Sequence, residues 1–227
     1  MKITPLLDLF YPPRCAFCSA FVQGRGNHFP LCCPKCTTDL PYLSEKDKRQ
    51  TGAFFRLAIA PFSYEGLVQE SLHRFKFRGG RHLAESYGPI LAQCILELSP
   101  GPFDLVSWIP VSRKRYKNRG YDQAQLLALE TAKYLHTQAV PLLEKVRDVP
   151  PQSSLGGLDQ RQANIKDAYA MLPGAQPVLD KKILLIDDVC TTGATLSEAA
   201  SVLLRAGCEE VLCATLAKTI IKTASEV

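Results

Sequence analysis

Two neighbouring carboxylates, Asp187 and Asp188, are followed within seven residues by three threonines and a glycine. The glycine, Gly193, lets the backbone approach a ligand closely and adopt an unusual φ angle. Hydroxyl and free backbone N–H groups suit a phosphate, whereas the two acids would repel it and suit sugar hydroxyls or hydrated Mg²⁺. This chemistry predicts a sugar phosphate whose 5′-phosphate lies on the loop and whose 2′ and 3′ hydroxyls lie beside the acids.

The residues expected to hold this ligand are the two acids and five consecutive loop positions. They are Asp187, Asp188, Thr191, Thr192, Gly193, Ala194 and Thr195. The stretch is not a Walker A loop, because the Gly-x-x-x-x-Gly-Lys pattern is missing.

The elements around the loop must place it at the edge of a sheet. Residues 183–186 are four consecutive apolar residues, which is typical of a central parallel strand buried on both faces. Residues 197–207 carry apolar side chains at helical spacing and predict the helix that follows the loop. Open α/β sheets bind ligands outside the carboxyl end of a strand, at the start of the next helix.

Cysteines form a second chemical pattern, because five of the nine lie in the first 36 residues. Cys15 and Cys18 form one Cys-x-x-Cys pair, and Cys33 and Cys36 form another. Four thiolates suit tetrahedral Zn²⁺ and leave no open position, so a structural zinc is predicted rather than a catalytic one. Cys32 adjoins Cys33; the tighter spacing favours Cys33 as the ligand and leaves Cys32 as a bystander.

Basic residues account for the net charge of +5 and gather in two runs. One run, residues 111–119, contains Arg113 and Arg115 and follows a predicted strand at 105–109. The other lies between residues 74 and 81. Basic clusters imply anionic partners such as pyrophosphate, nucleotides or nucleic acid.

The rest of the chain predicts an α/β protein in two parts. A zinc-ribbon-like module is expected at residues 1–45 and a parallel-sheet domain at 53–220, joined by a polar linker at 44–52. Strands are expected within 53–64, 105–109, 139–143, 168–172, 183–186 and 210–216, and helices at 67–77, 84–98, 121–136 and 197–207. Since no apolar run is long enough for membrane insertion and the N-terminus lacks the apolar core of a signal peptide, a cytoplasmic location is expected.

The stretch from Asp187 to Thr195 resembles the phosphoribosyl pyrophosphate (PRPP) signature of type I phosphoribosyltransferases. Other segments resemble, in order, motifs of the ComF family (ComFC and GntX-type proteins), which joins a four-Cys zinc motif to a phosphoribosyltransferase-like domain. The matching segments are Phe75-Lys76-Phe77, Ile109-Pro110, Arg115, Arg119-Gly120-Tyr121-Asp122-Gln123, Gln152-Ser153, Arg161 and Asn164.

The resemblance implies a type I phosphoribosyltransferase fold and a role in natural transformation or DNA uptake. The implied reaction is displacement of pyrophosphate at C1 of PRPP through an oxocarbenium-like transition state. Its catalytic residues would be Asp187 and Asp188 at the ribose hydroxyls, and Arg113 and Arg115, which with Mg²⁺ would neutralise the departing pyrophosphate.

Three interpretations stay open at this point. The chain is an enzyme that transfers the phosphoribosyl group to an unknown acceptor, a regulator that binds PRPP without turnover, or a DNA-uptake factor. In the third case the partners would be single-stranded DNA, bound by the basic loops, and competence or helicase proteins.

Overall fold

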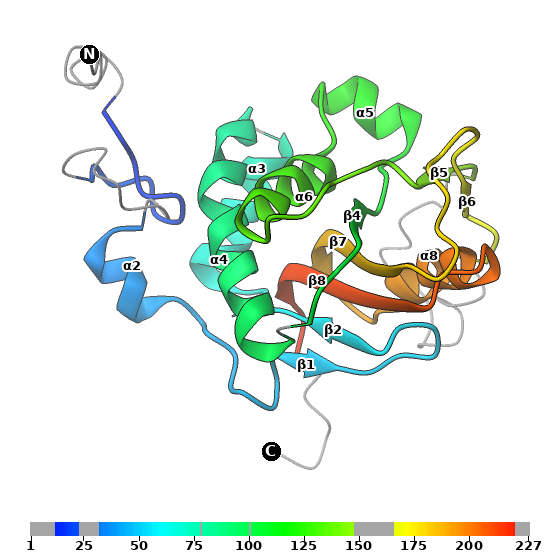
Figure 1. The fold of residues 1–227 in the computed structure, drawn as a ribbon. Coiled ribbons are helices and arrows are strands. Elements are labelled where there is room, and N and C mark those ends of the chain that lie inside the picture. The colour runs from blue at the N-terminus through cyan, green and yellow to red at the C-terminus, as the bar shows by residue number, and fades with distance from the viewer. Residues whose placement is uncertain (1–11, 23–31, 78, 100, 148–165, 221–227) are drawn as a thin grey trace, which may run out of the picture.

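The computed structural model describes residues 12–22, 32–77, 79–99, 101–147 and 166–220. A six-stranded sheet forms the centre of the molecule (Figure 1). Its strands, in spatial order, are β1 (Arg49–Gln50), β2 (Leu57–Ile59), β8 (Glu210–Lys218), β7 (Lys182–Cys190) and β4 (Leu105–Trp108), with β3 (Phe62–Ser63) paired to the end of β8. All the neighbours pair in parallel except β1, which lies antiparallel to β2. The predicted parallel-sheet fold class is confirmed.

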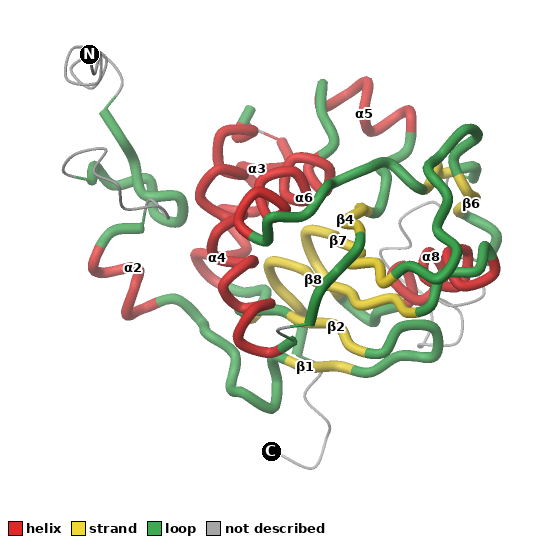
Figure 2. The backbone as a smooth tube through the Cα atoms, viewed as in Figure 1, coloured by secondary structure: helices red, strands yellow, loops and turns green. Residues whose placement is uncertain are grey.

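Helices cover both faces of this sheet, as Figure 2 shows. One face carries α3 (Gly66–Phe77), α4 (Ala84–Leu98) and α6 (Gln123–Tyr134), and the other carries α8 (Ala194–Arg205). A small two-stranded antiparallel sheet of β5 (Leu143–Lys145) and β6 (Tyr169–Met171) lies beside α8. The shorter described helices are α2 (Pro34–Asp39), η1 (Gly80–Leu83) and α5 (Arg113–Arg119).

Strand β7 is buried on both faces, as its apolar run predicts. Ile183 and Leu185 pack in the cluster with α8, whereas Leu184 and Ile186 pack in the cluster with α3, α4 and α6. This alternation follows from the two-residue period of a strand. The strand runs beyond the predicted end to Cys190, because its pairing with β8 continues to Lys218.

Two predicted elements differ in the structure. The expected strand at 139–143 is wrong: Ala139 makes a single bridge to Val106 of β4, and the strand β5 begins only at Leu143. Pro141 explains the interruption, since it has no N–H to donate to a neighbouring strand. The strand near 168–172 is present as β6, but it pairs with β5 rather than with the main sheet.

Several boundaries also move. The polar stretch 44–52, expected to be a linker, contributes the edge strand β1. The helix after the threonine loop begins at Ala194, three residues before the predicted start at 197. The basic run 111–119 forms the helix α5, which is capped by Ser112 at its start and by Gly120, with a φ of 77°, at its end.

The first cysteine pair packs against the helical layer. Phe17, between Cys15 and Cys18, is fully buried, and its ring centroid lies 5.4 Å from that of Phe62 and 5.8 Å from that of Tyr87. In the described part of the chain, no helix has the length and apolar character needed to cross a membrane.

Candidate functional site

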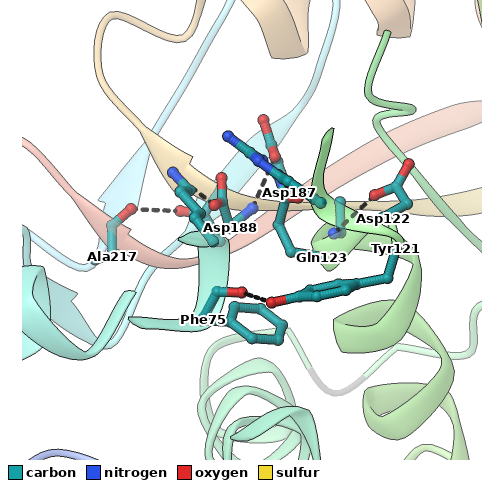
Figure 3. A network of polar contacts seen from close by, with 11 residues as sticks. Phe75, Tyr121, Asp122, Gln123, Asp187, Asp188 and Ala217 are labelled. Carbon is teal, nitrogen blue, oxygen red and sulfur yellow. Dashed lines mark hydrogen bonds and ion pairs between the residues drawn. The ribbon is translucent and has the colours of Figure 1, made fainter. Parts of the chain in front are cut away.

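The two acids lie near the carboxyl end of β7, where the sequence places them (Figure 3). Because side chains alternate along a strand, neighbouring residues point to opposite faces of the sheet. Asp188 lies on the face of α3 and is buried, at 5% exposure, whereas Asp187 is half-buried.

Asp188 has a partner that the sequence does not reveal. Its Oδ2 lies 2.6 Å from Nζ of Lys76, which comes from the last turn of α3. Burial lowers the pKa of Lys76, but the charge of Asp188, its hydrogen bond and the charge of Asp187 outweigh burial and raise that pKa overall. Lys76 therefore neutralises one member of the carboxylate pair.

Asp187 is held differently. Its Oδ1 accepts a hydrogen bond of 2.8 Å from the backbone N–H of Asp188. Burial, reinforced by the negative charge of Asp188, raises the pKa of Asp187 well above its usual range. Burial, with the charge of Asp187 added to it, also raises the pKa of the phenol of Tyr169 on β6. Asp187 is thus a carboxyl group whose charged form lacks a full counter-charge in the described residues, which suits a hydroxyl donor or a cation.

The threonine loop connects β7 to the start of α8. Gly193 directly precedes α8 and has a φ of 80°, a left-handed conformation that favours glycine. The N–H of Ala194 donates a 3.4 Å hydrogen bond to Oγ1 of Thr192. The side-chain amide of Gln50 on β1 also approaches, since a Cβ added to Gly193 would lie 3.0 Å from its Nε2. The loop therefore presents hydroxyls and helix N–H groups at one place, as a phosphate requires.

The structure separates the two arginines that the resemblance implicates. Both are exposed on α5, but Arg113 lines a cavity with Glu144 and Lys145, whereas Arg115 lines a cavity with Lys76. Arg115 thus shares a cavity with Lys76, which contacts an acid of β7.

Arg119 is a functional candidate to which the sequence assigned no role. Its Nη1 donates a 2.7 Å hydrogen bond to Oε1 of Gln123, and its guanidinium lies 4.7 Å from the ring centroid of Phe77. The hydroxyl of Tyr121 donates to the backbone carbonyl of Phe75 (Figure 3). These contacts join α5 and α6 to the last turn of α3. In the sequence, Arg119 and Tyr121 were marked by one short motif, residues 119–123, and the end of α3 by another, Phe75-Lys76-Phe77.

A cavity of about 610 Å³ opens beside these residues. Cations and aromatic rings share its walls, and none of the described lining residues is acidic. The lining residues are Tyr64, Lys76, Phe77, Gly79, Arg115, Asn118, Arg119 and Tyr121.

The four predicted cysteine ligands lie together, with their sulfur atoms within 4.8 Å of one another; they are Cys15, Cys18, Cys33 and Cys36. Sγ of Cys33 lies 3.6 Å from Sγ of Cys18 and accepts a 3.5 Å hydrogen bond from the N–H of Cys36. Cys32 is not one of the four, but its thiol lies beside them: it donates to the backbone carbonyl of Cys33, at 3.7 Å, and also interacts with the thiol of Cys15. This donor set fits a four-coordinate metal ion.

The cysteine site is attached to the same helix that supplies Lys76. Arg74 on α3 donates hydrogen bonds of 3.0 Å and 2.6 Å to the backbone carbonyls of Ala16 and Phe17. Ser71 on α3 donates to the carbonyl of Ala16 as well. The predicted loop residues Gln152, Ser153, Arg161 and Asn164 lie outside the described residues.

Comparison with known proteins gives consistent matches. Residues 126–226 match the family model described as "Phosphoribosyl transferase domain". The chain is 32% identical over 198 residues to Competence protein F of Haemophilus influenzae, which covers 83% of this chain and 85% of that protein. It is 30% identical over 155 residues to Competence protein ComFC of Bacillus subtilis, covering 64% of this chain and 57% of that protein. It is 28% identical over 214 residues to DNA utilization protein YhgH of Salmonella typhi, covering 89% and 90%.

Proposed function

The chain belongs to the ComF family, and from its site we propose that it binds PRPP or a related phosphoribosyl ligand as part of DNA uptake in natural transformation. The link to DNA uptake comes from the names of the relatives, which are competence and DNA utilization proteins. The proposed ligand is inferred from the residues of the site.

One observation carries the proposal: the acids of β7, the threonine loop and the start of α8 are consecutive and lie at the carboxyl edge of a parallel sheet. The 5′-phosphate binds at residues 191–195, where helix N–H groups and threonine hydroxyls converge. Asp187 and Asp188 accept hydrogen bonds from the ribose hydroxyls. Mg²⁺ accompanies the pyrophosphate, and Arg115 lies on the side of the acid pair that faces the cationic cavity.

Arg113 lines a different cavity from Arg115. We retain Arg113 together with Arg115 as the catalytic arginines of a transfer reaction in which an acceptor displaces pyrophosphate from C1. Arg113 would act by its charge alone, and Arg115 by direct contact.

The metal proposed for the four cysteines is a structural Zn²⁺, since four thiolates close its coordination shell. We further propose that residues 1–45 form the metal-binding module, that residues 53–220 form the phosphoribosyltransferase-like domain, and that the protein acts in the cytoplasm.

Calorimetric titration with PRPP and Mg²⁺, beside a titration with single-stranded DNA, tests the proposal. Saturable heat with PRPP that is lost in Asp187→Asn/Asp188→Asn supports it. Binding of DNA alone, with an affinity that falls steeply with salt, would favour the alternative of a non-catalytic DNA-binding or partner-binding factor. The exposed basic residues of α5, namely Arg113, Lys114, Arg115 and Lys117, are the observation in favour of that alternative.

A further inference from the structure

Lys76 belongs to two features at once. Its Nζ lies 2.6 Å from Oδ2 of Asp188, and its side chain also lines the cavity of about 610 Å³. Both partners of the ion pair are shielded, with side-chain exposures of 19% for Lys76 and 7% for Asp188. At this depth, removal of one partner leaves an uncompensated charge, which is strongly unfavourable.

The pair also competes with the proposed ligand. Lys76 contacts Oδ2 of Asp188, so a ribose hydroxyl that donates to this oxygen must compete with the ammonium. If Lys76 leaves Asp188 to make room, its charge requires a new partner. The flexible four-carbon stem of a lysine allows such a movement.

The adjoining cavity has room for the ammonium of Lys76 but provides no negative charge to pair with it. Arg115 and Arg119 already contribute positive charge to its walls, and none of the described lining residues is acidic. Arg119 is held in place by Gln123 and Phe77, so the cavity keeps its cationic character. An anion that stabilises Lys76 there must therefore come from the ligand.

We propose that Lys76 is a specificity-determining residue, which pairs with Asp188 in the free protein and with the ligand's diphosphate in the complex. The site thereby selects a phosphoribosyl ligand with an anionic group at C1 over ribose 5-phosphate, which has none. This inference rests on the proposed function and adds the basis of selectivity to it. The raised pKa of Lys76 is consistent with an ammonium that stays charged.

Calorimetric affinities for PRPP and for ribose 5-phosphate, both with Mg²⁺, test the proposal. Lys76→Met should weaken PRPP binding about tenfold or more, because a charge-assisted contact is lost. Ribose 5-phosphate binding should stay the same or strengthen, because Asp188 becomes free. The ratio of the two affinities is therefore expected to fall at least about tenfold.

A matched control is Lys133→Met, which removes a lysine paired with Glu130 at the same 2.6 Å on the exposed side of α6. It should leave the ratio unchanged. Should Lys76→Met fail to fold, Lys76→Met/Asp188→Asn removes both charges and should show the same low ratio. Lys76→Arg, which keeps the charge, should retain part of the selectivity.

The outcomes separate the two proposals. A wild-type protein that binds neither ligand refutes the proposed function and this inference together. A wild-type protein that binds PRPP, with Lys76→Met weakening both ligands by the same factor or weakening neither, overturns only the inference, since Lys76 is then purely structural.

Discussion

Truncation of Phe17 tests whether the metal-binding segment and the sheet domain share one core. The ring is fully buried between Phe62 of β3 and Tyr87 of α4. Its backbone carbonyl stays bonded to Arg74 in Phe17→Ala, so the cost arises from the lost ring. Truncation of a buried phenylalanine costs about 3–5 kcal/mol, a large part of the roughly 5–15 kcal/mol of a typical domain. At about 2–4 °C per kcal/mol, the melting temperature should fall by roughly 6–20 °C.

The chain supplies its own probe for this experiment. Trp108 is the single tryptophan, lies on β4 in the sheet and is 7% exposed, so its fluorescence reports on the domain rather than on the cysteine site. Urea titration of the metal-loaded protein should move the Trp108 transition to lower urea in Phe17→Ala. Phe21→Ala is the matched control: this ring is 64% exposed, with the guanidinium of Arg14 4.2 Å from its centroid, and its loss should cost less than about 1 kcal/mol.

A shared core is refuted if Phe17→Ala loses its metal while the Trp108 transition stays at the urea concentration of the wild type. The metal-binding segment would then fold apart from the sheet, and the contacts of Phe17 would contribute nothing to the stability of the domain.

Three further predictions concern the acids, the metal and the loop. Because the pKa of Asp187 is raised on folding, the folded wild type binds more protons and loses stability as the pH rises from the ordinary Asp pKa to the raised one. In urea titrations, the free energy of unfolding of Asp187→Asn minus that of the wild type should therefore be larger at about pH 8 than at about pH 4. The same difference at both pH values would contradict this. Elemental analysis should find zinc lost in Cys33→Ser and retained in Cys32→Ser, and the reverse result would exchange their roles. Gly193→Ala should lose about 1–2 kcal/mol of stability in thermal melts, because φ is 80° and its Cβ would meet Gln50, so an unchanged melt would argue against strain.

Patterns that depend on local sequence predicted much of this structure. The apolar run 183–186 predicted a strand buried on both faces, and two Cys-x-x-Cys spacings predicted which sulfur atoms meet. The helix at 84–98 has the bounds that its apolar spacing indicates. In each case the feature is encoded by the period of the side chains or by the spacing of residues within a short segment.

Such patterns did not predict the contacts between segments that are distant in the sequence. Lys76 and Asp188 meet because α3 ends at the carboxyl edge of β7, which depends on how the layers pack. The different directions of Arg113 and Arg115 follow from the helix of α5, in which residues two apart face different sides. Their shared basic run gave no sign of that helix.

The position of β8 has a consequence for synthesis of the chain. It lies between β2 and β7 and so joins an early strand and a late strand in one sheet. Between Ile59, at the end of β2, and Glu210, at the start of β8, 150 residues must be translated. At about 5–20 residues per second, roughly 8–30 s pass between the synthesis of β2 and that of its parallel partner β8. Throughout that interval its apolar side chains are available to chaperones, and a chain that stops before residue 210 leaves the sheet without its central connection.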